Sequence, residues 1–187
     1  MEIRPTADRL RETLFDVLCA GDPQALAGTT WVDLYAGTGA VGIEALSRGA
    51  SMVYFVETSR AAAELIAANL SSLGITGGFG IEKAEVARVL RRLGSGNTVA
   101  DFVFLDPPYS VEEEYAKTLA ILGESGLLNK RSVVIAEHQK KFDPGDTFGE
   151  LGRYRKLLQG DAALSFYRRA TYSPPDGGAR ADSSTSE

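Results

Sequence analysis

The residues best suited to chemistry are Asp106-Pro107-Pro108-Tyr109, which follow the apolar run Phe102–Leu105. An exocyclic amine on an aromatic base is a poor nucleophile, because its lone pair is delocalised into the ring. An anionic oxygen and a carbonyl that accept its two N–H hydrogens draw it toward a more nucleophilic state. Asp106 offers the carboxylate, Pro107 a carbonyl held by fixed φ angles, and Tyr109 a surface for base stacking. The motif therefore predicts Asp106, Pro107 and Tyr109 as catalytic residues of an amine-modifying enzyme.

A glycine-rich loop, Gly37-Thr38-Gly39-Ala40-Val41-Gly42, matches the pattern G-x-G-x-x-G. It follows an expected strand and opens an expected helix, with Glu57 at the end of the next strand. The glycines let a ligand approach the backbone closely, and Glu57 can accept hydrogen bonds from ribose hydroxyls. NAD and S-adenosylmethionine both carry such a ribose. The loop alone therefore predicts a ligand of the adenosine type.

Asp33 favours S-adenosylmethionine over NAD. It lies four residues before Gly37, near the place where a dinucleotide puts its pyrophosphate, and an uncompensated carboxylate there repels phosphate. S-adenosylmethionine puts an ammonium group and a sulfonium in that region instead. The alternative is structural, with Asp33 capping a loop amide and Glu57 merely ending a strand.

Alternating strands and helices position both motifs. The expected strands are 31–35, 52–56, 79–82, 102–105 and 133–137, and the expected helices are 6–20, 39–48, 59–73, 85–93 and 112–122. Thr6 is the expected N-cap of the first helix and Gly21 its stop. This alternation predicts an α/β fold with a mostly parallel sheet covered on both faces. Ligands bind at the carboxyl ends of such strands, so Asp106 should face the glycine loop.

The end of the chain changes this rhythm. The runs Arg153–Leu158 and Ala163–Arg169 flank the turn residues Gln159-Gly160-Asp161 and predict an antiparallel hairpin. Residues 171–187 are rich in Pro, Gly, Ser and Asp and are expected to be a disordered tail. We therefore expect a single domain over residues 1–170, with an N-terminal helix.

Composition narrows the class of protein. A chain of 187 residues with 44% hydrophobic content suits one core. It has no apolar run of membrane-spanning length and no secretory signal, so we expect no membrane association and a cytoplasmic location. Cys19 lies on the apolar stripe of the first helix and is interpreted as a core residue, and one Cys with one His predicts no metal site.

The net charge of −5 argues against binding nucleic acid by bulk electrostatics. Basic residues nevertheless cluster near both ends of the chain: Arg4, Arg9, Arg11, Arg153, Arg155, Lys156, Arg168 and Arg169. If the two ends meet in the fold, they form a local basic face; otherwise these residues are scattered, solvated charges.

The segments Arg4–Glu12, Asp33–Ala50 and Asp106–Tyr109 together closely resemble the RsmD family, which comprises bacterial guanine-N2 methyltransferases acting on 16S ribosomal RNA. The resemblance extends from Arg4 to about Arg169. It implies the class I methyltransferase fold, which is Rossmann-like, with seven mostly parallel strands and a C-terminal antiparallel hairpin. It also implies S-adenosylmethionine as cofactor and 16S rRNA as partner, either naked or in an assembling small subunit. We expect a monomer.

The motifs and the resemblance together assign the remaining site residues. The expected cofactor contacts are Asp33, Tyr35, Ala36, Gly37, Thr38, Gly39, Glu57, Thr58, Ala84 and Asp106. The expected RNA contacts are Arg4, Thr6, Arg9, Arg11, Pro108 and Tyr109. Lys83, which stands where relatives tend to carry Asp or Asn, is given no role. His138 is interpreted as an exposed loop residue, because the transfer requires no histidine.

Three alternatives remain open. The site motif also suits methyl transfer to N6 of adenine in DNA or to a glutamine amide of a protein. A chain of this length has little room for a separate DNA-recognition domain, which disfavours sequence-specific DNA modification. A non-catalytic RNA-binding protein of the same fold and a NAD-dependent oxidoreductase are the other classes. Cofactor turnover and relative affinity for NADH distinguish them.

Overall fold

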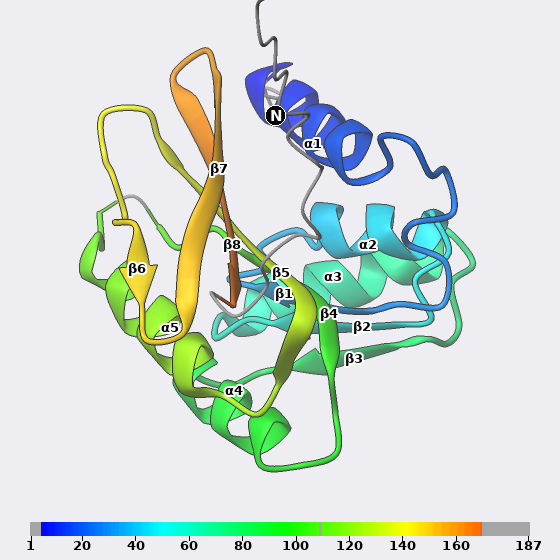
Figure 1. The fold of residues 1–187 in the computed structure, drawn as a ribbon. Coiled ribbons are helices and arrows are strands. Elements are labelled where there is room, and N and C mark those ends of the chain that lie inside the picture. The colour runs from blue at the N-terminus through cyan, green and yellow to red at the C-terminus, as the bar shows by residue number, and fades with distance from the viewer. Residues whose placement is uncertain (1–4, 109, 170–187) are drawn as a thin grey trace, which may run out of the picture.

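The computed structural model describes residues 5–108 and 110–169. These residues form one mixed sheet flanked by helices (Figure 1). The helices are α1 (Pro5–Leu18), α2 (Ala40–Ser47), α3 (Arg60–Ser72), α4 (Val86–Gly94) and α5 (Glu113–Glu124). The strands are β1 (Thr30–Leu34), β2 (Met52–Val56), β3 (Phe79–Glu82), β4 (Ala100–Leu105), β5 (Leu128–Gln139), β6 (Thr147–Phe148), β7 (Leu151–Gln159) and β8 (Ala162–Arg169).

The described strands are arranged in the order β3-β2-β1-β4-β5-β8-β7-β6. The first five in this order pair in parallel, whereas β8 is antiparallel to both β5 and β7. Seven strands were expected, and the two-residue β6 is added at the edge beyond β7. The chain order reverses between β1 and β4, so the glycine loop after β1 and the Asp106 motif after β4 emerge side by side.

Two apolar cores lie on opposite faces of the sheet, and alternation along each strand assigns its residues to one or the other. One core packs α4 and α5 against side chains such as Leu105 and Ala136. The other packs α1, α2 and α3 against side chains such as Phe55, Phe104 and Ile135. Figure 1 shows the helices on the two sides of the sheet. A side chain that follows any of these strands can therefore be assigned to one face.

The first helix starts earlier than expected. α1 already includes Pro5 and Thr6, so the prediction of Thr6 as N-cap is wrong. Proline suits the first turn of a helix because its φ is helical and its missing N–H has no partner there. Leu10 and Leu14 of α1 share the core of Leu164 from β8, so the two ends of the described chain do meet. The predicted tail lies outside the described residues.

The interpretation of His138 as an exposed loop residue is wrong. β5 continues past the expected end to Gln139, because residues as far as Gln139 pair with β8. His138 is fully buried, and its Nε2 lies 2.9 Å from Ser165 Oγ. Burial lowers the pKa of His138, so the ring is a neutral core group on the α5 side of the sheet.

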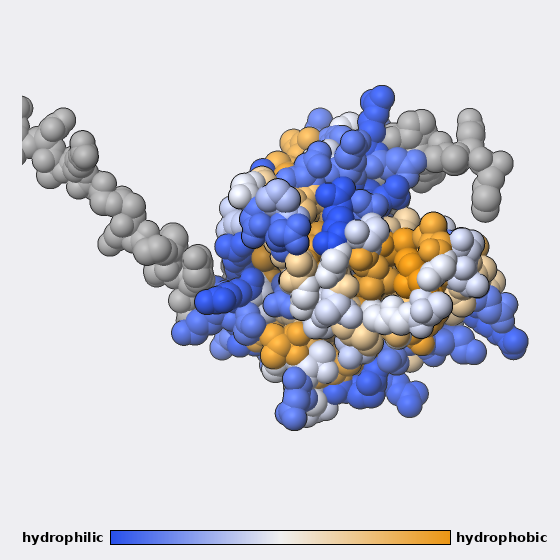
Figure 2. All heavy atoms as spheres, turned by 90° about the vertical axis from the view of Figure 1, so that its right-hand side faces the viewer, coloured by the Kyte–Doolittle hydropathy of each residue, from blue (hydrophilic) through white to orange (hydrophobic). Residues whose placement is uncertain are grey.

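The outer surface of α2 and α3 has an apolar hollow. It is lined by residues that include Ile43, Leu46, Leu73 and Ile75, and Figure 2 shows apolar side chains gathered on this face. Leu73 is 61% exposed, more than any other large hydrophobic side chain of the described residues. No helix among residues 5–108 and 110–169 has the length and apolar character needed to cross a membrane.

Candidate active site

The glycine loop is shaped by three left-handed backbone positions, one of which is Gly37 with φ 53°. Tyr35, directly after β1, has φ 59°, and Gly39, the residue before α2, has φ 76°. Gly39 donates its N–H to Ala36 O at 2.7 Å, which closes the loop into a tight turn. The Tyr35 side chain points to α5, where its hydroxyl lies 2.8 Å from Thr118 Oγ1. Only the backbone of Tyr35 is therefore placed toward the predicted cofactor position.

Asp33 is buried on β1 and organises the start of α2. Its Oδ2 accepts the Gly42 N–H at 2.9 Å, which satisfies one of the first amides of the helix. Burial raises the pKa of Asp33 to about 8, and the charges of Asp106 and Glu57 add to the effect. The structural alternative considered for Asp33 is thus a real contact. Its second oxygen remains for a ligand, and a cation beside it would lower the raised pKa and favour the carboxylate.

The raised pKa of Asp33 gives a test in the pH dependence of stability. Between the ordinary value of 3.8 and the folded value of about 8, the folded state retains a proton that the unfolded state has lost. The contribution of Asp33 therefore makes the free energy of unfolding fall as pH rises through this window. In Asp33→Asn this contribution is absent, and the amide oxygen can still accept the Gly42 N–H. Urea denaturation from about pH 5 to pH 8 should give a smaller decline than in wild type.

An exposed acid serves as the control for this experiment. Asp161→Asn, in the turn before β8, should leave the wild-type pH dependence unchanged. Parallel declines for Asp33→Asn and wild type would contradict the assignment of a raised pKa to Asp33.

Glu57 contacts the glycine loop from the end of β2. One carboxylate oxygen accepts the Gly37 N–H at 3.0 Å and the other accepts the Ser59 N–H at 2.9 Å. These bonds hold the carboxylate against the loop, at the position predicted for the ribose of the cofactor. Thr58 is exposed beside it, and Ala84 follows β3 with its N–H bonded to Glu82 O. The direct use of these residues in binding stays a prediction.

Asp106 has a partner that the sequence analysis did not select. In the parallel pairing of β4 with β5, Leu105 is opposite Ala136, so the next residues, Asp106 and Glu137, lie side by side. Burial raises the pKa of both carboxyls, and the negative charge of Asp106 raises that of Glu137 further. Both acids directly follow the inner part of an apolar strand, a signal in the sequence that could have identified Glu137.

Four carboxyl groups occupy one face of the sheet at its carboxyl edge: Asp33, Glu57, Asp106 and Glu137. Each directly follows a residue of the α4–α5 core, or lies between two of them, so all four are directed toward the α1–α3 side. Mutual repulsion contributes to the raised pKa values of Asp33 and Glu137. Among the described residues, none of the four forms an ion pair with a basic side chain. The four carboxyl groups at this edge can therefore accept several hydrogen bonds and can attract a positively charged group.

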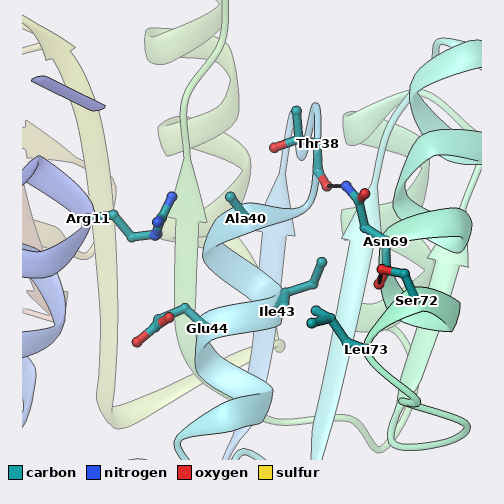
Figure 3. Close-up of a pocket in the computed structure, with 8 residues that line it drawn as sticks. All are labelled: Arg11, Thr38, Ala40, Ile43, Glu44, Asn69, Ser72 and Leu73. Atoms are coloured by element: carbon teal, nitrogen blue, oxygen red, sulfur yellow. Dashed lines mark hydrogen bonds between the residues drawn. The ribbon is translucent and has the colours of Figure 1, made fainter. Parts of the chain in front are cut away.

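Figure 3 shows a pocket beside the glycine loop, between α1, α2 and α3. It has a volume of about 350 Å³, and its lining includes Arg11, Thr38, Glu44 and Asn69. Asn69 donates a hydrogen bond to Thr38 O at 3.0 Å, which ties α3 to the loop. Arg11, a predicted RNA contact, and Thr38, a predicted cofactor contact, thus line the same pocket.

Four of the seven described basic residues near the two ends form ion pairs. Arg153 contacts Asp143 and Asp146, Lys156 contacts Asp143, and Arg169 contacts Glu150. Near the pocket, Arg11 pairs with Asp8 at 3.1 Å. Arg9 is exposed on α1, and its carbonyl accepts a hydrogen bond from Gln159 at 3.5 Å. The two ends meet, and acidic residues compensate part of their positive charge.

Several predicted residues fall outside the part of the site that can be described. Arg4 and Tyr109 are not among the described residues, and nothing is described of the Thr6 side chain. Pro107 is buried and Pro108 exposed directly after Asp106. The Pro108 carbonyl accepts the Val111 N–H at 2.9 Å. Within residues 5–108 and 110–169, the Pro107 carbonyl accepts no hydrogen bond. The role predicted for it, as an acceptor for the amine, requires this.

Comparison with known proteins decides the family. The family model described as "Conserved hypothetical protein 95" matches residues 1–168. The chain belongs to this family. The resemblance to the RsmD family is confirmed by ribosomal RNA small subunit methyltransferase D of Escherichia coli (strain K12), which is 30% identical over 181 residues, covering 93% of this chain and 83% of that protein. YlbH of Bacillus subtilis (strain 168), provisionally named an rRNA methyltransferase, is 30% identical over 166 residues, covering 89% and 88%.

Solved structures confirm the fold of this conserved hypothetical protein 95 family member. Escherichia coli yhhF, provisionally described as a methyltransferase, has a TM-score of 0.75 and 27% identity, covering 89% of this chain and 88% of that chain. SMU.776, crystallised with SAH, has a TM-score of 0.68 at 16% identity, covering 89% and 50%, and shows the fold alone. The Escherichia coli neighbour and the two rRNA methyltransferase relatives support methyltransferase activity.

Proposed function

We propose that this protein transfers a methyl group from S-adenosylmethionine to the N2 amino group of a guanine in 16S ribosomal RNA. The observation that carries the proposal is the placement of Asp106 and the Pro107 carbonyl beside the glycine loop, across the reversal between β1 and β4. An activated methyl donor on the loop would thus lie next to two acceptors suited to an amine. Catalysis is then mainly orientation of the amine against the methyl group.

The charge of the site fits this cofactor. S-adenosylmethionine supplies a methyl group activated by a sulfonium and also carries an ammonium group. Asp33 is buried without an ion-pair partner among the described residues, and Glu57 contacts the loop amide of Gly37. A cation offsets the repulsion within this carboxyl cluster, whereas the pyrophosphate of NAD would increase it. The carboxyl groups of the site therefore favour binding of S-adenosylmethionine and disfavour binding of a dinucleotide.

The amine is the part of the substrate that the motif addresses. The Asp106 carboxyl accepts one N–H and the Pro107 carbonyl accepts the other, which orients the nitrogen lone pair toward the methyl group. Because Pro107 is buried and is the second residue after the end of β4, its carbonyl is held close to a rigid element. No covalent intermediate with the protein is needed, since the donor is already activated.

The RNA assignment rests on the relatives and on the position of α1. The Escherichia coli relative is named a small subunit rRNA methyltransferase. Arg9 is exposed on α1, and Arg11 lines the pocket beside Thr38. Arginine in these positions can contact phosphate close to the cofactor. Because part of the positive charge is compensated by acids, the protein is better suited to a structured target, such as an assembling subunit, than to RNA of any sequence and structure.

The proposal is tested by transfer of labelled methyl to components from a strain lacking the activity. The substrates are 30S subunits, 30S assembly intermediates, naked 16S rRNA and DNA, each followed by nucleoside analysis. We expect N2-methylguanosine at one position of 16S rRNA. N6-methyladenine, or label confined to protein, would retain the fold and reject the proposed substrate, and tighter binding of NADH than of S-adenosylmethionine would reject the cofactor.

A further inference from the structure

Glu137 is held at the carboxyl end of β5 by contacts on both sides. Its register partner on β8 is Leu164, and its carbonyl accepts a hydrogen bond from the Tyr115 hydroxyl of α5 at 2.7 Å. The backbone at this position is therefore fixed. A side chain that starts from a fixed strand end is positioned with little loss of entropy when a ligand binds.

The side chain of Glu137 is directed into the same space as that of Asp106. Along β5, Ala136 belongs to the α4–α5 core and Ile135 to the α1–α3 core, so Glu137 lies on the α1–α3 side. Leu105 and Phe104 place Asp106 on that side by the same alternation. The pairing of Leu105 with Ala136 makes the two carboxyl groups neighbours.

Glu137 is held at an electrostatic cost that a purely structural residue would avoid. Its side chain is half-buried rather than solvated, and burial together with the charge of Asp106 raises its pKa. Among the described residues no basic side chain pairs with it. Carboxyl groups perturbed in this way are characteristic of functional sites.

We infer that Glu137 accepts the N1–H of the target guanine while Asp106 accepts a hydrogen of the neighbouring amino group. Guanine carries adjacent donors at N1 and N2 on its Watson–Crick edge, the edge by which unstacked bases are read. In adenine and cytosine the ring nitrogen beside the amino group is an acceptor and opposes a carboxylate. Two adjacent carboxyl acceptors thus match guanine, which makes Glu137 a specificity-determining residue. The inference rests on the proposed function.

The test replaces the target guanosine by 2-aminopurine riboside, which retains the amino group and lacks the N1 hydrogen. The substrate is 16S rRNA, ligated to carry either base at the position that wild-type enzyme modifies. Losing a hydrogen bond to a charged acceptor costs a factor of about 10–100, so wild type should prefer guanosine by about that factor. Glu137→Ala should transfer to guanosine about 10–100-fold more slowly and lose most of the preference.

The isosteric variant separates recognition from packing. In Glu137→Gln the amide N–H can donate to the bare N1 of 2-aminopurine, so transfer to this base should rise relative to wild type while transfer to guanosine falls. Thermal unfolding and S-adenosylmethionine binding should stay near wild type. Glu124→Gln, an exposed residue at the end of α5, is the matched control with unchanged preference.

The outcomes separate the two proposals. An unchanged guanosine preference in both Glu137 variants overturns the role of Glu137, even if wild type forms N2-methylguanosine. A slowing of transfer to both bases by the same factor also overturns it, because it assigns Glu137 a structural role. Failure of wild type to form N2-methylguanosine on any rRNA substrate rejects the proposed function itself.

Discussion

Replacing Asp106 by alanine is expected to slow methyl transfer at least about 10²-fold and to leave S-adenosylmethionine affinity within a few-fold of wild type. The reason is that Asp106 is proposed to accept a hydrogen of the amine, whereas the glycine loop and Glu57 are predicted to hold most of the cofactor. The slowing should appear in single-turnover transfer to saturating rRNA, with cofactor binding measured separately by calorimetry.

Two further variants sharpen this prediction. Asp106→Asn retains an acceptor oxygen without the charge, so its rate should fall between those of wild type and Asp106→Ala. Asp161→Ala changes an exposed turn residue and should transfer normally. A wild-type rate in Asp106→Ala would remove the amine-polarising role, and loss of cofactor binding in proportion to rate would assign Asp106 to the cofactor alone.

A methyl group at Gly42 is expected to destabilise the fold and weaken cofactor binding. A Cβ there would overlap the Phe55 ring and lie 2.8 Å from Val53 Cγ1. Both neighbours are buried side chains of β2, so the overlap is relieved by displacing them within the core or by moving α2 and the attached glycine loop. Overpacking of this kind costs about 1–3 kcal/mol and outweighs the helix-propensity gain of at most about 1 kcal/mol. The melting temperature of Gly42→Ala should fall by about 2–10 °C.

Two other residues of the protein provide a control for the Gly42→Ala experiment and a way to restore its stability. Gly77 has nothing within 4 Å of an added Cβ, so Gly77→Ala should stay within about 0.5 kcal/mol of wild type. In the double variant Gly42→Ala/Phe55→Leu the smaller side chain makes room for the methyl group. Coupling between the two substitutions should therefore be favourable. A Gly42→Ala protein as stable as Gly77→Ala would contradict the close packing of α2 on β2.

The parts of the fold that the sequence predicted well are those encoded by short local patterns. β2 and β3 have the expected bounds, and the glycine loop and Asp106 lie at the same edge of the sheet. Apolar runs and turn residues are sufficient for this, because strand burial and loop geometry are both local. The expected hairpin near residues 153–169 is also present as β7 and β8.

The errors arise where distant segments decide the outcome. β5 extends from Leu128 through a polar stretch to Gln139, and its last residues are held by pairing with β8 rather than by their own propensity. This pairing buries His138, which the local pattern indicated as a loop residue. Glu137 follows an apolar run as Asp106 does, but its proximity to Asp106 is set by strand register. Register cannot be obtained from the composition of either strand.

The position of β8 between β5 and β7 has a consequence for synthesis on the ribosome. All motif-bearing strands have emerged when residue 139 leaves the exit tunnel, but one edge of β5 still lacks its partner. That edge is buried and apolar in the folded protein and exposes unpaired amides until residues 162–169 appear, a state prone to aggregation. Because Leu164 pairs with the strand at Glu137, the nascent chain holds the carboxyl groups of Asp106 and Glu137 side by side only after β8, the last of the described strands, has been translated.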